Sequence, residues 1–107
     1  MAPVTRFAAF KYKPGTTNEQ KRASLDGLIK LYEDNAHMVD VGPRGGANNS
    51  TEGFDKGFDV VFTVVFKSKA HRDEFVPDPA HLAYKESIMS IVEDVIVYDY
   101  EEGVFGY

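Results

Sequence analysis

The segment from Phe58 to Lys67 constrains the fold most, because an extended chain here carries apolar side chains on both of its faces. Its aromatic and branched residues alternate along one face: Phe58, Val60, Phe62, Val64 and Phe66. The other face carries Val61, Thr63 and Val65. Such a pattern is typical of a strand that is covered on both sides, so the segment is predicted to be central in a sheet.

A second two-sided strand is predicted from Val4 to Lys13, ending at Pro14 and Gly15. Thr17 with Gln20 three residues later forms a capping-box pattern, which predicts the start of a helix. The apolar residues that follow recur at helical spacing: Leu25, Leu28, Ile29 and Tyr32.

The middle of the chain gives weaker signals. A short strand is expected from Ala36 to Val41, followed from Gly42 to Gly53 by a glycine- and asparagine-rich stretch without any apolar period. This stretch is expected to be a mobile surface loop.

The last third of the chain is predicted to hold two helices and a strand. Ser68 is suited to cap a short helix that runs to about Phe75. Asp78 is a natural N-cap, and Pro79 is a natural first residue of a second helix. That helix would bury a stripe containing Tyr84, Ile88, Ile91 and Val92. A final strand is expected from Val95 to Tyr100, with a tail after it.

The order strand–helix–strand–strand–helix–strand predicts a ferredoxin-like α+β fold, in which helices cover one face of a four-stranded antiparallel sheet. The chain of 107 residues is expected to form one such domain, residues 1–107. Because three of the strands are apolar on both faces, something must cover the second face. A second copy of the chain is the economical answer, which predicts a homodimer whose open sheet faces pack into a dimeric α+β barrel.

Composition excludes several classes of function. Twelve Lys and Arg against 17 Asp and Glu give a net charge of −5, which does not suit a nucleic-acid partner. Cysteine is absent, which excludes disulfides and thiolate sites. No apolar run is long enough to span a membrane, and the start lacks the apolar core of a signal peptide. We therefore expect a soluble cytoplasmic protein without a membrane partner.

Several segments resemble the stress-responsive dimeric α+β barrel family, known as Dabb. The resemblance lies in residues 4–13, 17–20, 57–68, 78–84 and 97–100, and is most specific at Pro79, Ala80 and His81. It covers nearly the whole chain except residues 42–53 and the tail. Members of that family include polyketide cyclases that use no metal or organic cofactor, lyases of small cyanohydrins, and stress-induced oligomers without a settled reaction. The resemblance therefore implies a fold and leaves the activity open.

His81 matches the histidine that serves as catalytic base in the cyclase-like members of this family. It lies in the first turn of the predicted helix, where the positive end of the helix dipole disfavours the imidazolium and keeps a neutral base available. It shares a helix face with Tyr84 and Ile88 and is expected to point at the helix–sheet core. The alternative is a histidine that only caps the helix start or bonds to a carbonyl group.

Arg6 interrupts an apolar strand face between Val4 and Ala8. Facing a cavity, it would hold a carboxylate or an enolate oxygen, a role that we also consider for Tyr84. The alternative is that Arg6 extends to a carboxylate at the surface. Cyclase-like members also pair their histidine with a tyrosine six residues earlier, and here that position is Phe75, which has no hydroxyl group.

We expect a small apolar pocket between helices and sheet that binds a small oxygenated organic molecule. The residues expected to line it are Phe10, Leu28, Phe62, Phe75 and Ile88. No metal is expected, because His37 and His71 do not combine with His81 in a ligand spacing.

The sequence thus predicts a cofactor-free enzyme, cyclase- or lyase-like, in which His81 removes a proton next to a carbonyl group. The alternative is a non-catalytic stress-responsive oligomer, and a haem-degrading or quinol-oxidising monooxygenase ranks last because no convincing haem ligand is present. An open pocket beside His81 would favour the enzyme. A core packed solid by Phe75, Tyr84 and Ile88 would favour the oligomer.

Overall fold

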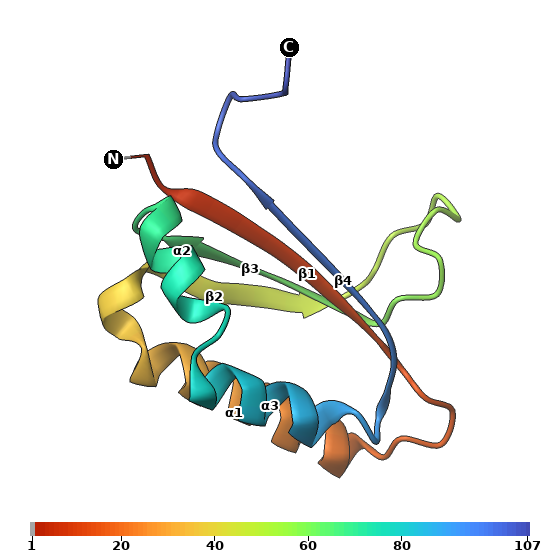
Figure 1. The fold of residues 1–107 in the computed structure, drawn as a ribbon. Coiled ribbons are helices and arrows are strands. Elements are labelled where there is room, and N and C mark those ends of the chain that lie inside the picture. The colour runs from red at the N-terminus through yellow and green to blue at the C-terminus, as the bar shows by residue number, and fades with distance from the viewer. Residues whose placement is uncertain (1) are drawn as a thin grey trace.

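Four antiparallel strands form one sheet in the computed structural model, which describes residues 2–107 (Figure 1). They are β1 (Val4–Tyr12), β2 (Val39–Ala47), β3 (Val60–Phe66) and β4 (Val92–Tyr100), and their spatial order is β2-β3-β1-β4. The two strands that are apolar on both faces, β1 and β3, lie at the centre, as the sequence predicts, and they pair with each other. The edge strands are β2 and β4.

Three α-helices cover one face of the sheet (Figure 1): α1 (Asn18–Asp34), α2 (Lys69–Phe75) and α3 (Pro79–Ile88). α1 and α3 lie next to each other below the sheet, and α2 lies at the end where β3 leaves it. A single 3₁₀ turn, η1 (Ala36–Met38), joins α1 to β2. The architecture is the ferredoxin-like α+β fold that the element order predicts.

The predicted caps begin all three helices. The Thr17 hydroxyl accepts from the backbone N–H of Gln20 at 3.1 Å, and the Gln20 side chain accepts from the N–H of Thr17 at 2.9 Å. The Ser68 hydroxyl accepts from the N–H of His71 at 3.2 Å, and the Asp78 carboxylate accepts from the N–H of Ala80 at 3.0 Å. These bonds satisfy backbone donors that have no partner inside the first turn of a helix.

The prediction for the middle of the chain was wrong in two places. The residues Ala36–Met38 form the 3₁₀ turn, and the strand starts only at Val39. Residues 42–47, expected to belong to a mobile loop, are part of β2 and pair with β3. Glycine is required here because a Cβ at Gly45 would collide with the carbonyl oxygen of Val61 and lie 2.8 Å from the Cα of Phe62. The composition that suggested a loop therefore reflects close backbone approach between two strands.

The connection between β2 and β3 is organised around one carboxylate. Asp55 accepts a hydrogen bond from the side chain of Asn48 at 2.7 Å and another from the backbone N–H of Gly57 at 2.9 Å. These hydrogen bonds lower the pKa of Asp55.

At the other end of the chain, β4 begins at Val92, three residues before the predicted start.

The core lies between the sheet and the helices and is rich in aromatic rings. Its most deeply buried members come from β3 and α2: Val64, Phe66 and Phe75.

On the opposite face of the sheet no helix is present within the described residues, and Tyr98 and Tyr100 of β4 remain 66% and 48% exposed. After β4 the chain extends away from the sheet (Figure 1). No helix in residues 2–107 has the length and apolar character needed to cross a membrane.

Candidate active site

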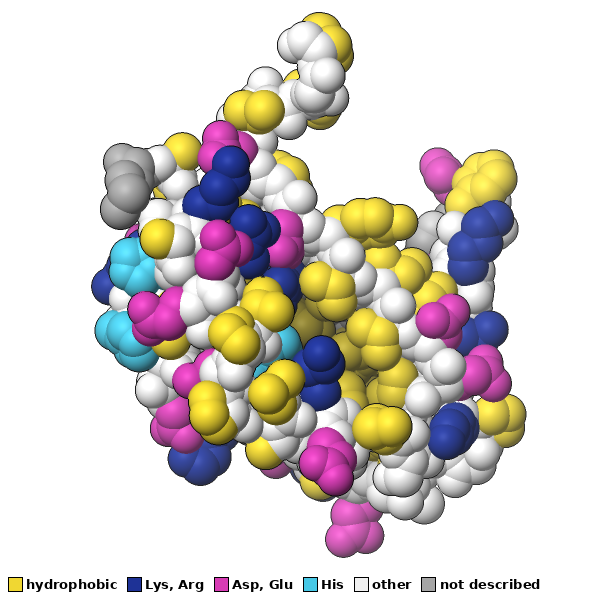
Figure 2. All heavy atoms as spheres, viewed as in Figure 1, with side chains coloured by type: hydrophobic (Ala, Val, Ile, Leu, Met, Phe, Trp, Pro, Cys, Tyr) yellow, Lys and Arg dark blue, Asp and Glu magenta, His cyan; other side chains and the backbone are white. Residues whose placement is uncertain are grey.

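A cavity of about 560 Å³ lies between α3, α1 and the sheet. It opens beside β4, where Val95 and Val97 face the helices but remain 43% and 48% exposed. Figure 2 shows this hollow, with mostly hydrophobic side chains around it. Four of the residues predicted to contact a substrate line it: Phe10, Leu28, Phe62 and Ile88.

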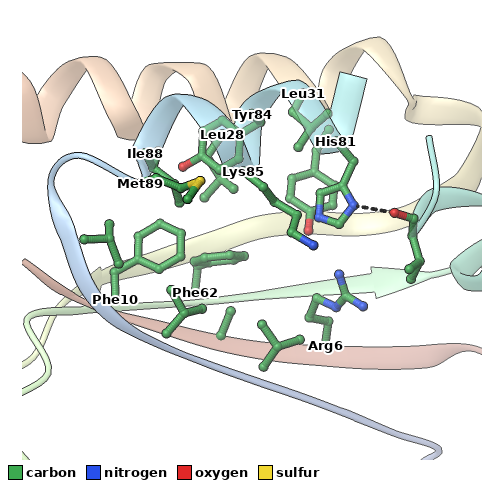
Figure 3. A pocket seen from close by; sticks show the side chains of 16 residues that line it. Arg6, Phe10, Leu28, Leu31, Phe62, His81, Tyr84, Lys85, Ile88 and Met89 are labelled. Carbon is green, nitrogen blue, oxygen red and sulfur yellow. Dashed lines mark hydrogen bonds between the residues drawn. The ribbon is translucent and has the colours of Figure 1, made fainter. Parts of the chain in front are cut away.

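One end of the cavity is polar. The side chains that provide this polarity are Arg6 from β1, Tyr32 from α1, and His81 and Lys85 from α3. Figure 3 shows Arg6, His81 and Lys85 close together, with Phe10, Ile88 and Met89 grouped toward the other end. Tyr84 also lines the cavity, so all three residues proposed from the sequence as catalytic contribute to its wall.

Arg6 is buried and held by a carboxylate on the neighbouring strand. Its Nε and Nη2 donate to the two carboxylate oxygens of Asp99 at 2.8 and 3.0 Å, and the two residues are cross-strand partners in the β1–β4 register. The guanidinium also lies over the rings of Phe66 and Phe75, at 5.4 and 5.8 Å from their centroids. Both sequence readings of Arg6 are thus partly met: it pairs with a carboxylate, and it faces the cavity.

Asp99 serves two guanidinium groups. Besides Arg6 it accepts from Nη1 of Arg72 at 3.1 Å. Burial alone would raise the pKa of Asp99, but the hydrogen bonds and charges of the two arginines outweigh it and lower that pKa. Burial likewise opposes the charge of Arg6, yet pairing with Asp99 prevails and raises its pKa. The pair is therefore fully ionised around neutral pH.

The tautomer of His81 follows from one hydrogen bond. Its Nδ1 lies 3.0 Å from the carbonyl oxygen of Val76, drawn as the dashed line in Figure 3. A carbonyl oxygen can only accept, so in the neutral ring Nδ1 carries the hydrogen and Nε2 carries the free lone pair. The imidazole ring also packs on Phe75, with centroids 4.4 Å apart. These two contacts fix both the orientation of the ring and the nitrogen that is able to accept a proton.

The surroundings of His81 favour its neutral form. Burial is the largest influence and lowers its pKa, and the positive charges of Arg6 and Lys85 lower it further. The Val76 carbonyl and the Asp78 carboxylate act in the opposite direction but do not cancel these effects. His81 is therefore an unprotonated base at neutral pH.

The two tyrosines of the cavity wall differ in what their hydroxyl groups can do. The Tyr84 hydroxyl donates to the backbone carbonyl of Ser24 at 2.9 Å, which commits its hydrogen to α1. Burial raises the pKa of Tyr84, so the phenol stays protonated. The pKa of Tyr32 is raised to about 12, because the effect of burial exceeds the opposing effect of the nearby Arg6 charge. Tyr32 is thus a protonated phenol beside the guanidinium.

Phe75 lies outside the cavity wall, although it was predicted to contact a substrate. It is fully buried and stacks on Tyr32, with ring centroids 4.9 Å apart and planes inclined by 11°. Its ring also packs against His81. Phe75 therefore packs against the two rings that border the polar end. A ring without a hydroxyl group suits this fully buried position.

Sequence reasoning missed three residues of the site. Tyr32 was assigned only to the apolar stripe of α1, and Lys85 was not singled out. Asp99 alternates with Val95 and Val97 on the inward face of β4, where a lone acidic residue facing a core was a detectable signal. Its partner became visible only with the strand register.

The remaining histidines lie elsewhere. His37 contacts Glu74 at 3.1 Å on the exposed surface, and Nδ1 of His71 lies 2.6 Å from the Ser68 hydroxyl. Within the part of the chain that the structure describes, no three metal-ligating side chains are grouped to hold an ion.

The comparison with protein families matches residues 4–102 to the Stress responsive A/B Barrel Domain. The chain therefore belongs to the Dabb family. The comparison with curated proteins found no match.

Several solved structures share the fold over nearly the full length of the chain. An Arabidopsis thaliana protein is similar with a TM-score of 0.83 at 23% identity, over 91% of this chain and 92% of its own. A hydroxynitrile lyase from Passiflora edulis has a TM-score of 0.83 at 18% identity, over 94% and 93%. A dimeric ferredoxin-like protein of unknown function from Thermobifida fusca has a TM-score of 0.76 at 16% identity, over 94% and 91%. At these identities the likeness concerns the fold, and activity has to be argued from the site.

Proposed function

We propose that this protein is a cofactor-independent enzyme that moves a proton at, or next to, a carbonyl group of a small organic molecule, with His81 as the base. The observation that carries this proposal is the Nδ1–H···O=C hydrogen bond to Val76, which leaves the lone pair of Nε2 available on a residue that lines an open cavity. The lowered pKa of His81 supports the role, because a base must be unprotonated before it acts.

The negative charge that develops on the substrate oxygen requires donors in the same cavity. Nε and Nη2 of Arg6 are bonded to Asp99, while Nη1 has no such bond and is assigned to this oxygen. The protonated phenol of Tyr32 is assigned as a second donor. Tyr84 was the sequence candidate for this role, but its hydroxyl is bonded to Ser24, so we assign its ring to the wall that positions the substrate.

The proposed step has two forms with the same proton acceptor. In a cyclase-like reaction, Nε2 removes the proton from the carbon next to the carbonyl, and the bonding pair moves toward the carbonyl oxygen as an enolate. In a lyase-like reaction, Nε2 removes the hydroxyl proton of a cyanohydrin, the carbon–carbon bond to the nitrile breaks, and cyanide leaves as the carbonyl forms. The structural likeness to a hydroxynitrile lyase supports including the second form.

The rival function is a non-catalytic oligomer with a filled core. Phe75 and Ile88 belong to the buried core, and Tyr84 packs against it. A cavity of about 560 Å³ nevertheless remains open beside His81. A protein that needed only a solid core would bury the 43% and 48% exposed valines of β4 as well. The open cavity therefore favours an enzyme.

The proposed enzyme is a homodimer that forms through the open face of the sheet. That face presents Phe7, Val61, Val65, Ile96 and Tyr98, which alternate with the inward-facing residues of β1, β3 and β4. An apolar surface of this kind gains stability when a second copy excludes water from it. The cavity lies on the other side of the sheet from this proposed interface.

Two substrates test the proposed reaction. Methyl 3-oxooctanoate in deuterated buffer reports proton removal next to a carbonyl, through loss of the C2–H signal in NMR spectra. Mandelonitrile reports the lyase form, through the absorbance of released benzaldehyde. We expect acceleration of at least one reaction, and a loss of about 10²–10⁴-fold in the His81→Ala variant, the usual contribution of a general base.

His37→Ala is the matched control, because it removes a histidine that lies outside the cavity. It should retain the rate of the unchanged protein. The proposal is contradicted if His81→Ala remains folded and reacts at the unchanged rate, or if neither substrate reacts faster than in buffer alone.

A further inference from the structure

The cavity is chemically divided along its length. Figure 3 shows Arg6, His81 and Lys85 toward one end and Phe10, Ile88 and Met89 toward the other. A molecule that fills such a space must itself be divided, with a polar group at one end and a hydrocarbon segment at the other. The polar atom that Figure 3 shows toward the apolar end is the Tyr84 hydroxyl, and its hydrogen is already donated to the backbone carbonyl of Ser24.

The polar end of the cavity carries more positive than negative charge. Arg6 and Lys85 line the cavity, whereas no acidic side chain of residues 2–107 does. The charge of Arg6 is met by Asp99, which lies behind it and is shared with Arg72. Lys85 forms no ion pair within these residues, although the chain as a whole carries a net charge of −5. Lys85 is exposed at the cavity, and because no acidic side chain of the described lining balances the two positive charges, charge complementarity favours an anionic group of a ligand at this end.

Lys85 stands one helical turn after His81 on the same face of α3. Figure 3 shows its side chain pointing from the helix toward Arg6 rather than outward. Its charge also acts on His81, which places the ammonium within electrostatic reach of the proposed base. A group bound to Lys85 is therefore held next to the reacting position.

We propose that Lys85 is a specificity-determining residue that binds the carboxylate of an amphipathic substrate, whose hydrocarbon tail occupies the end of the cavity near Phe10 and Met89. The substrate class is then a carbonyl compound with both a carboxylate and an alkyl tail. This inference rests on the proposed function for the reacting carbonyl, but the binding of the two ends is independent of turnover. Lys85 suits the role better than Arg6, because Asp99 already occupies two donors of Arg6.

Octanoate and octanamide test the inference, since they share their length and shape and differ in charge. Isothermal titration calorimetry should show that octanoate binds the unchanged protein at least about tenfold more tightly than octanamide, as a charge-assisted hydrogen bond would provide. Lys85→Met should remove most of this preference and leave the affinity for octanamide within about twofold. Lys85→Arg should keep a clear preference for octanoate.

Lys67→Met is the matched control, because it removes one positive charge at the end of β3 and outside the cavity. It should keep the preference for octanoate. The inference is overturned by equal binding of the two probes, by the absence of octanoate binding at millimolar concentration, or by an unchanged preference in folded Lys85→Met. His81→Ala should still prefer octanoate, so a failure of the proposed catalysis would not imitate a failure of this proposal.

Discussion

Replacing Asp99 by Asn should destabilise the protein far more than an ordinary surface substitution. Asp99 accepts two hydrogen bonds from Arg6 and one from Arg72, and the exposed fractions of the Arg6 and Asp99 side chains are 8% and 17%. The substitution removes the negative charge while the positive charge of Arg6 stays buried against the aromatic rings of Phe66 and Phe75.

Breaking one partner out of a buried ion pair costs about 3–5 kcal/mol, because the remaining charge is left without compensation. Asp99 retains some exposure, and Asn can still accept one hydrogen bond, so we expect the lower end, about 3 kcal/mol. At about 4 °C per kcal/mol for a domain of this size, the melting temperature should fall by about 12 °C. The matched control is Glu93→Gln, which breaks a pair with Lys11 between the same two strands. That pair is 36% and 47% exposed and should contribute no more than about 1 kcal/mol.

Urea unfolding at a fixed protein concentration measures both variants, since association would make stability depend on concentration. The pH dependence of the free energy of unfolding gives a second test. The folded pKa of Asp99 is lowered, so the stabilisation is present above the unfolded pKa of an aspartate and is lost as pH falls through the folded value. Asp99→Asn should lose this part of the pH dependence. Equal destabilisation by Asp99→Asn and Glu93→Gln would refute the reasoning.

Three further outcomes follow from the same structure. Gly45→Ala should destabilise the protein by about 2 kcal/mol or more in urea unfolding, because its Cβ would collide with the backbone of β3. At Gly46 a Cβ would meet open space, so Gly46→Ala should change stability by less than about 0.5 kcal/mol. Similar effects of the two substitutions would contradict the packing argument. Val65→Asp should convert a dimer into a monomer in light scattering, and a dimeric mass for this variant would exclude the open sheet face as the interface. The proton-transfer rate should be constant between pH 7 and 8 and decrease on acidification with a midpoint below the ordinary histidine pKa, since His81 has a lowered pKa and is inactive when protonated; a rate that rises on acidification would exclude it as the base.

The sequence predicted correctly those elements whose own side chains indicate burial or a helix start. β1 and β3 are the two central strands, and the apolar residues on their helix-facing side are buried in the core, so their alternation indicated this position. The helix starts were equally readable, because caps such as Thr17 and Asp78 act within four residues of chain. In contrast, residues 42–47 of β2 contain three glycines, which have no side chain to show an alternating pattern. Their strand conformation is imposed by β3, a partner that local sequence does not identify.

The candidate site was readable in part for the same reason. His81 follows a helix cap and Arg6 interrupts an apolar face, so each one stands out locally. Asp99 and Tyr32 matter because the sheet register and the packing of α1 bring them to Arg6, across 93 and 26 positions of sequence. Phe75 looks like a pocket residue from its spacing to His81, yet its ring turns into the core and stacks on Tyr32. Which face a buried aromatic ring presents depends on tertiary packing, which sequence spacing does not specify.

The mouth of the cavity gives this protein freedom to diverge. Val95, Val97 and Met89 contact whatever enters, but their exposed fractions of 43%, 48% and 69% mean that exchanging them hardly affects folding. The deep wall is different, because Phe10 and Phe62 belong to the core and truncating either would cost several kcal/mol. Natural selection can therefore change the length and shape of the cavity at the rim, one residue at a time, while its polar end and the scaffold stay as they are.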